Sequence, residues 1–156
     1  MKKVSIIIPV YNEEKTIIQI LKKINLEKKK IKNFIFEIIV INDNSTDKTK
    51  ELLDKVKNLY DKFLTHDKNY GKGEAIKSGL NISTGEYVLF QDADLEYDVN
   101  DYSKILFPIS TYSADIVMGS RFKGSKLTRC FNFTNLFGNK LITFLFSILY
   151  NSTLSD

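Results

Sequence analysis

The sequence has few of the residues that cross-link proteins or anchor them in membranes. Cys130 is its one cysteine, so no internal disulfide can form, which fits a reducing, cytoplasmic compartment. His66 is its one histidine, and a single histidine cannot build a histidine-rich metal site. No apolar run reaches the roughly 18 residues that a membrane span needs. We therefore expect a globular chain that does not itself cross a membrane.

Neither sign of charge dominates. The 156 residues include 23 Lys and Arg against 19 Asp and Glu, a net charge of +4. Coding bias alone can produce this small excess, but it can also favour an anionic partner such as a phosphate or a membrane surface. We expect no nucleic-acid partner. The length predicts a single domain, and a hydrophobic content of 43% suits a packed core.

Short apolar runs alternate with helical patterns along the chain. Strands are predicted at 4–10, 34–41, 62–66, 87–90 and 115–118. The first intervening helix shows a buried stripe at helical spacing, formed by Ile17, Ile20, Leu21 and Ile24. This alternation predicts an α/β fold with a mainly parallel central sheet flanked by helices.

Capping residues and charge predict where the helices begin and end. Asn12 is expected to cap the first helix, with two acids in its first turn, and a charged loop at 27–32 is expected to end it. Ser45 or Thr46 is expected to cap the second helix. Pro108 is expected to end a later one.

The stretch 87–98 (YVLFQDADLEYD) joins a predicted strand to a cluster of acids. Its four apolar residues in succession are typical of a strand buried on both faces. In extended backbone Asp92, Asp94 and Glu96 would share one face. Three such oxygen donors can hold Mg²⁺ or Mn²⁺ against a phosphate. A solvated acidic loop would contain the same residues.

Other polar residues also follow predicted strands, at the edge where open α/β sheets bind ligands. Asp43 can accept hydrogen bonds from a base or ribose, or it can be a turn aspartate. Gly71 and Gly73 flank a lysine just before a helix, where backbone can approach a ligand closely. Arg121 carries a guanidinium fork that can grip a phosphate.

The segment 131–150 is apolar almost all round. It is either a helix buried on protein or a helix in the membrane interface, beside a basic loop that contains Lys123, Lys126 and Arg129. We divide the chain accordingly into a catalytic domain, 1–130, and an apolar tail, 131–156. We interpret the tail as a truncated segment that faces the acceptor or the membrane.

Five motifs in order resemble the family 2 glycosyltransferases of GT-A fold, across nearly the whole chain. They are VSIIIPVYNEE, VINDNSTDKT, NYGKGEAIKSG, YVLFQDADLEYD and VMGSRF. Within that family the chain is most similar to the dolichyl- and polyprenyl-phosphate mannosyl- and glucosyltransferases. The resemblance implies an inverting enzyme of cell-envelope glycan synthesis that moves mannose or glucose from GDP-mannose or UDP-glucose to a polyprenyl or dolichyl phosphate. Such an enzyme would use Mg²⁺ or Mn²⁺ and act peripherally at the cytoplasmic face of a membrane.

The resemblance also assigns site residues. Asp92 and Asp94 would form the catalytic DxD motif and bind metal, with Glu96 as a further ligand where the family often has Gln. Asn42 stands where the family usually has an aspartate. The expected nucleotide-sugar-binding residues are Pro9, Tyr11, Glu13, Ile41, Asp43, Asp92, Ala93, Asp94 and Arg121.

Three alternatives remain open at the level of sequence. The first is a family 2 transferase that acts on a saccharide acceptor, which usually needs a carboxylate base. The second is a nucleotidyltransferase, although those enzymes usually begin with a Gly-rich, basic loop that PVYNEE does not resemble. The third is a truncated protein that binds nucleotide without turnover.

Overall fold

The computed structural model describes residues 1–119 and 133–149 of the chain. The predicted site residue Arg121 and the basic loop that follows it lie outside this description. Two short 3-10 helices, η1 (Lys57–Leu59) and η2 (Val99–Asp101), accompany the main elements. Those elements are β1 (Lys2–Val10), α1 (Ile17–Lys30), β2 (Phe34–Asn42), α2 (Thr49–Lys55), β3 (Lys62–Thr65), α3 (Lys72–Ile82), β4 (Tyr87–Phe90), α4 (Tyr102–Tyr112) and α5 (Phe133–Leu149).

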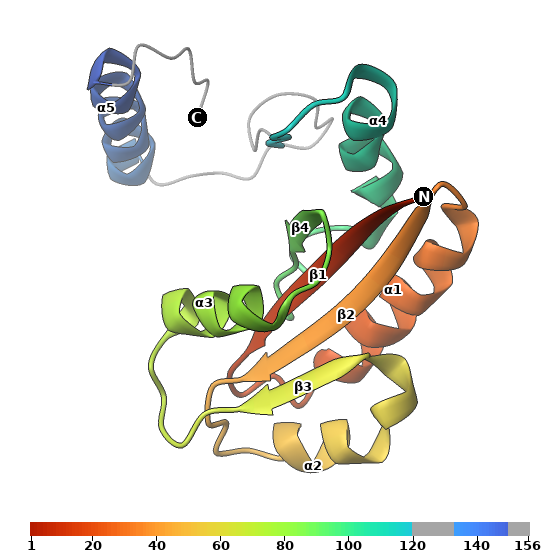
Figure 1. Cartoon of the computed structure of the whole chain (residues 1–156). Coiled ribbons are helices and arrows are strands. Elements are labelled where there is room, and N and C mark those ends of the chain that lie inside the picture. Colours follow the sequence, from red (N-terminus) through yellow and green to blue (C-terminus); the bar gives the residue numbers. More distant parts are fainter. Residues whose placement is uncertain (120–132, 150–156) are drawn as a thin grey trace.

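The four strands form one sheet in the order β3-β2-β1-β4, and every neighbouring pair is parallel. The register pairs Pro9 of β1 with Ile41 of β2, and Ile7 of β1 with Phe90 of β4. The loops that follow β1, β2 and β4 therefore leave the sheet along the same edge (Figure 1). The prediction of an α/β fold with a parallel sheet and flanking helices is confirmed.

Alternate side chains of the strands build two cores, one on each face of the sheet. Ile6 and Ile8 of β1 pack in the larger core with the predicted stripe of α1, whose four residues are all fully buried. Ile7 packs on the opposite face with Ile39 and with Ala75 of α3. Figure 1 shows the resulting layers, with α3 on one face of the sheet and α1 on the other.

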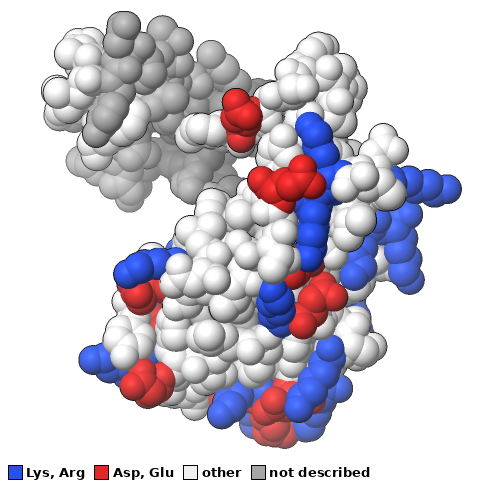
Figure 2. Space-filling model, in the orientation of Figure 1, with Lys and Arg blue, Asp and Glu red and all other residues white. Residues whose placement is uncertain are grey.

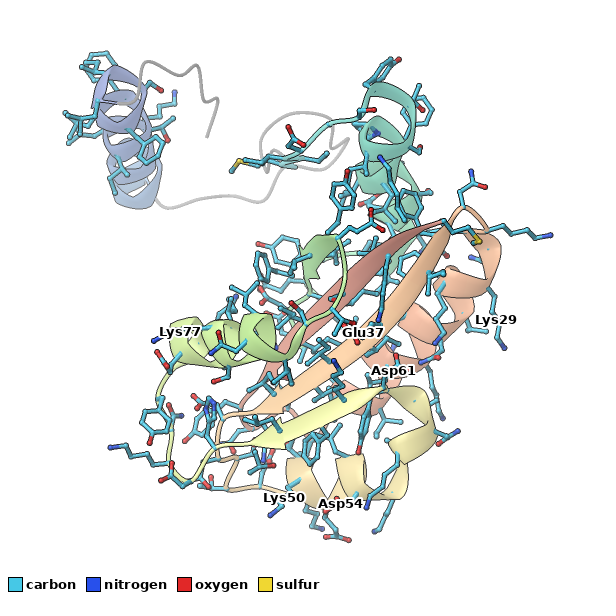
Figure 3. All side chains as sticks on the ribbon, in the orientation of Figure 1. Lys29, Glu37, Lys50, Asp54, Asp61 and Lys77 are labelled. Atoms are coloured by element: carbon cyan, nitrogen blue, oxygen red, sulfur yellow. The ribbon has the colours of Figure 1, made fainter. Side chains whose placement is uncertain are left out.

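A buried carboxylate ties the start of β4 to the other strands. Glu37 of β2 (Figure 3) accepts hydrogen bonds from Ser5 Oγ at 2.7 Å and from the Thr84 backbone N–H at 2.9 Å. Its Oε1 also lies 3.0 Å from Lys62 Nζ. At Gly85 a Cβ would lie 2.6 Å from the Ser5 backbone nitrogen, so only glycine fits there. These contacts fix the path by which α3 leads into β4.

Two of the predicted helix starts are wrong. α1 begins at Ile17 and α2 at Thr49, several residues after the predicted caps. Asn12 instead adopts a left-handed backbone conformation with φ 56°. Its Oδ1 accepts a hydrogen bond from the backbone N–H of Thr46 at 2.8 Å, and its own backbone N–H donates to Ser45 Oγ. The polar residues that were predicted to cap helices therefore join the loop after β1 to the loop after β2.

Two helix ends also differ from prediction. α1 continues through most of the charged run to Lys30, because Glu27 is buried and pairs with Lys30 at 2.7 Å. Three lysines in its last turn also suit the negative end of the helix dipole. Pro108 lies inside α4, which continues for one further turn to Tyr112.

Two strand predictions need correction. β4 lies at the edge of the described sheet, and Phe90 is 54% exposed, so this strand is not buried on both faces. No strand forms at 115–118, where Ile116 and Met118 are exposed. An apolar run becomes a strand only when another strand pairs with it, and the described residues provide no such partner here.

The apolar tail contains a helix, as predicted. α5 carries large apolar side chains that are 43–77% exposed, namely Leu141, Ile142, Phe144, Leu145, Phe146, Ile148 and Leu149. The described part of the chain does not cover this surface. No helix in that part is long and apolar enough to cross a membrane.

On the face of the molecule shown in Figure 2, basic and acidic side chains are interspersed.

Candidate functional site

A pocket opens at the edge of the sheet where β1, β2 and β4 end and α3 begins. The lining comes from all four of these places along the chain: Pro9, Val10, Tyr11, Glu13, Asp43, Lys72, Ala75, Asp92, Ala93 and Asp94. The structure thus brings together most of the nucleotide-binding residues that the sequence predicted. Ile41 is fully buried in the sheet next to Pro9, so its contact with a nucleotide stays a prediction.

Hydrogen bonds to the neighbouring loop shape the wall that follows β1. The backbone N–H of Glu13 donates to Thr49 Oγ1 at 2.9 Å, and that of Glu14 donates to Asp47 Oδ2 at 3.2 Å. The backbone N–H of Lys48 donates in return to Glu14 Oε2 at 3.0 Å. Residues that would otherwise fray before α1 are thereby held against the loop after β2.

Asp43 forms the buried end of the pocket and is only 2% exposed. Its Oδ1 accepts from the Tyr70 backbone N–H at 3.0 Å, and its Oδ2 from the Gly71 backbone N–H at 2.7 Å. Burial alone would raise the pKa of this carboxyl. The hydrogen bonds from Tyr70, His66 and Gly71 outweigh that effect and hold the pKa below its usual range. Asp43 is therefore an ionised acceptor fixed in place.

His66 connects Asp43 to α3. Its Nδ1 lies 2.6 Å from Asp43 Oδ1 and its Nε2 lies 2.9 Å from Ser78 Oγ. Because an ionised carboxylate only accepts hydrogen bonds, Nδ1 must carry the proton. The histidine side chain is 8% exposed, and the Tyr70 ring packs edge-on against it. This lone histidine therefore positions the carboxylate.

The acidic stretch after β4 bends instead of staying extended. Ala93 and Asp94 form a turn, and Leu95 has a positive φ of 64°. Asp92 and Asp94 both line the pocket, whereas the backbone N–H of Glu96 closes the turn by donating to Asp94 Oδ1 at 2.9 Å. The predicted single face for all three acids is therefore wrong. Among residues 1–119 and 133–149, no three acidic, histidine or cysteine side chains are grouped closely enough to hold a metal.

A buried pair of side chains, Gln91 and Tyr102, supports this turn. Gln91 is 2% exposed, and its Oε1 accepts a hydrogen bond from the Tyr102 hydroxyl at 2.9 Å. Burial raises the pKa of Tyr102, so its hydroxyl keeps its proton. The Gln91 amide in turn donates to the Asp92 carbonyl at 3.0 Å. The sequence analysis missed this support, because only the fold brings Tyr102 next to Gln91.

Sequence analysis also missed Lys72. Its Nζ lies 2.5 Å from Asp92 Oδ1, and its side chain is 59% exposed in the pocket. The available signal is its place between Gly71 and Gly73, which predicts a close approach of backbone to a ligand but assigns no role to the lysine itself. An ammonium at this position can meet an anionic ligand that enters the pocket.

Comparison with known proteins places these residues in a family. A model of glycosyl transferase family 2 matches residues 5–151. The chain belongs to glycosyl transferase family 2. The five motifs that suggested this family are spread over the matched residues, and the resemblance is confirmed.

Two relatives within this family illustrate the similarity. A dolichyl-phosphate beta-glucosyltransferase from Trichomonas vaginalis is 36% identical over 135 residues, which are 80% of this chain and 42% of the relative. A dolichol-phosphate mannosyltransferase from Pyrococcus furiosus is 32% identical over 127 residues, 80% of this chain and 35% of the relative. The chain therefore spans less than half the length of either.

Solved glycosyltransferase structures show the same GT-A fold. S. aureus TarS in complex with UDP-GlcNAc has a TM-score of 0.61 and 28% identity, over 80% of this chain and 37% of TarS. The mannosyltransferase PcManGT from Pyrobaculum calidifontis, in complex with GDP-Man and Mn²⁺, has a TM-score of 0.53 and 28% identity. That match covers 64% of this chain and 30% of PcManGT.

Proposed function

We propose that this chain binds a nucleotide sugar and transfers its hexose, mannose or glucose, to a polyprenyl or dolichyl phosphate with inversion at the anomeric carbon. The observation that carries the proposal is the pocket that joins Asp43, Asp92 and Asp94 with Lys72. The buried hydrogen-bond acceptor Asp43 matches the base of a nucleotide sugar. The two acids and the cation match its diphosphate with a bound metal ion. The names of the family relatives support the lipid-phosphate acceptor.

The residues of the pocket fit a divalent metal ion. Asp92 and Asp94 offer hard carboxylate oxygens, which Mg²⁺ and Mn²⁺ prefer. The ammonium of Lys72 lies 2.5 Å from Asp92 Oδ1, which supports cation binding at this carboxylate. Glu96, the further ligand that the resemblance implied, does not line the pocket with these two acids, so Asp92 and Asp94 are the proposed metal ligands. When bound, a divalent ion neutralises charge on the leaving nucleoside diphosphate.

The side chains of the pocket then have separate tasks. Asp43 accepts a hydrogen bond from the base, while Pro9, Tyr11 and Glu13 form the wall along the nucleotide. Lys72 attracts the diphosphate. The attacking oxygen belongs to a lipid phosphate that is already anionic at neutral pH, so the chain needs no general base to deprotonate it. Attack from the face opposite the leaving group inverts the anomeric carbon.

α5 is the proposed contact with the membrane that holds the lipid acceptor. Its exposed side chains are apolar at nearly every described position, and Lys140 lies exposed near them. An exposed apolar helix with nearby cations binds at membrane interfaces, more strongly when the lipids are anionic. We propose peripheral attachment at the cytoplasmic face.

A panel of nucleotide sugars tests the proposal. The protein is incubated with GDP-mannose or UDP-glucose, polyprenyl phosphate and Mg²⁺ or Mn²⁺, and glycolipid formation and nucleotide binding are measured on the same sample. Glycolipid that requires both the lipid phosphate and the metal ion supports the proposal. Binding without transfer supports a nucleotide-binding protein that does not turn over. Absence of both would contradict the proposed function.

A further inference from the structure

We infer that the base site built on Asp43 accepts a single N–H donor, that it therefore selects a uracil nucleotide over a guanine nucleotide, and that His66 sets this selectivity. The inference rests on the proposed function and narrows its substrate from nucleotide sugars in general to uridine diphosphate sugars.

The side chain of Asp43 already accepts three hydrogen bonds. An ionised carboxylate offers about four acceptor positions, two on each oxygen. Oδ1 receives His66 Nδ1 at 2.6 Å and the Tyr70 backbone N–H at 3.0 Å, so both of its positions are filled. Among residues 1–119 and 133–149, Oδ2 receives only the Gly71 backbone N–H, at 2.7 Å. One acceptor position on Oδ2 is left for a ligand in the pocket that Asp43 lines.

Uracil and guanine differ in the number of N–H donors that they present to this one acceptor position. Uracil presents one N–H, at N3, between two carbonyl groups, so a single free acceptor satisfies it. Guanine presents two adjacent donors, N1–H and the N2 amino group, which need both oxygens of a facing carboxylate. Because Oδ1 is full, bound guanine would keep one of these donors unpaired beside a carboxylate side chain that is only 4% exposed. An unpaired buried donor weakens binding on the order of tenfold to a hundredfold.

His66 is the side chain that fills an acceptor position on Oδ1. Its ring is held on one side by Ser78 Oγ at 2.9 Å and on the other by the edge-on Tyr70 ring, with ring centroids 5.3 Å apart. His66 is not among the residues that line the pocket, so it acts through Asp43. It is a positioning residue, and its removal should open a second acceptor position on Oδ1.

The test is the ratio of the dissociation constants of GDP and UDP, measured by calorimetry in Mg²⁺. The wild type should favour UDP by about tenfold or more. His66→Ala should bring the ratio close to one, mainly because GDP binding improves relative to UDP binding. His66→Asn places an amide N–H near the position of Nδ1 and should keep the wild-type ratio. Circular dichroism confirms that each variant is folded.

The outcomes test two claims separately, the preference for uracil and the role of His66. Equal affinities in the wild type, or a preference for GDP, would overturn the inference without relying on any variant. A folded His66→Ala protein with an unchanged ratio would overturn the role of His66. Both of these results leave nucleotide binding intact. If neither nucleotide binds, the proposed function fails together with the inference.

Discussion

Lys72 Nζ lies 2.5 Å from Asp92 Oδ1, so the first residue of α3 meets the acid that follows β4 across the pocket. Lys72 belongs to a helix and Asp92 to the loop after β4, and both line the pocket at the carboxyl edge of the sheet. A divalent ion that binds Asp92 must compete with this ammonium. Once displaced, the ammonium remains close to the site proposed for the diphosphate.

Replacing Lys72 with Met should therefore have opposite effects on two ligands. Mn²⁺ should bind the nucleotide-free variant more tightly, by up to about fivefold, because an exposed ion pair contributes about 1 kcal/mol or less. UDP in Mg²⁺ should bind more weakly, because its diphosphate loses a cation. Electron paramagnetic resonance measures free Mn²⁺, and calorimetry measures UDP. Lys77→Met is the matched control, since Lys77 lies on α3 and pairs with Glu74 outside the pocket. Weaker Mn²⁺ binding by Lys72→Met would contradict this competition.

Replacing Asp43 with Ala should weaken nucleotide binding both with and without metal. The reason is that Asp43 is the proposed acceptor for the base, whereas Asp92 and Asp94 are the proposed metal ligands. The loss should be on the order of tenfold to a hundredfold for UDP and for a UDP-sugar alike. Asp54→Ala, at an exposed position of α2 (Figure 3), is the control. An effect confined to metal-containing samples would place Asp43 at the metal instead.

Replacing Glu37 with Gln should destabilise the protein and alter its response to acid. Burial would raise the pKa of Glu37, but hydrogen bonds from Ser5 and Thr84 and the contact with Lys62 lower it well below its usual value of 4.5. A depressed pKa in the folded state contributes stability above pH 4.5 and loses it as the pH falls further. The variant should lose about 2 kcal/mol at pH 7.

The comparison with wild type across pH tests the sign of this effect. Urea unfolding at pH 7 and at successive values below pH 4.5 should show the difference between the two proteins shrinking as the pH falls. Glu51→Gln, at an exposed helical pair with Lys55, should change stability little at any pH. A constant difference across the whole pH range would show that Glu37 does not act through its charge.

Polar substitutions on α5 should reduce membrane binding. Ile142, Leu145 and Leu149 are 50–77% exposed and share one side of the helix by their spacing. Replacing all three with Asn should abolish flotation with phosphatidylglycerol vesicles, and high salt should weaken flotation of the wild type. The control replaces Ile116 and Met118 with Asn, because both are exposed apolar residues outside α5. Equal flotation of the two variants would rule out α5 as the attachment site.

Sequence patterns predicted the strands and helices whose burial follows from the spacing of their own apolar residues. Ile6 and Ile8 alternate with Ile7 along a strand that is buried on both faces, so the apolar run identified β1 without knowledge of the rest of the chain. The carboxyl edge of a parallel sheet then predicted that Asp43 and Asp92 would share a pocket, and both line it.

Predictions failed where a residue depends on a distant partner. Asn12 was read as a helix cap because its partner Thr46, which lies 34 residues away, becomes a neighbour only in the fold. Lys72 could not be assigned to Asp92 for the same reason. The run that contains Ile116 lacks a paired strand among the described residues, and strand propensity alone does not supply one.

Binding of UDP to the wild type and to Asp94→Ala, measured with Mn²⁺ and with EDTA, tests the central claim most directly. The wild type should bind more tightly in Mn²⁺, and Asp94→Ala should lose most of that gain, because the pocket keeps only one of its two acids at the proposed metal site. Asp101→Asn removes a nearby carboxylate that does not line the pocket and should behave as wild type. If Asp94→Ala keeps the wild-type affinity and metal dependence, the assignment of this pocket as a metal-dependent nucleotide-sugar site is wrong.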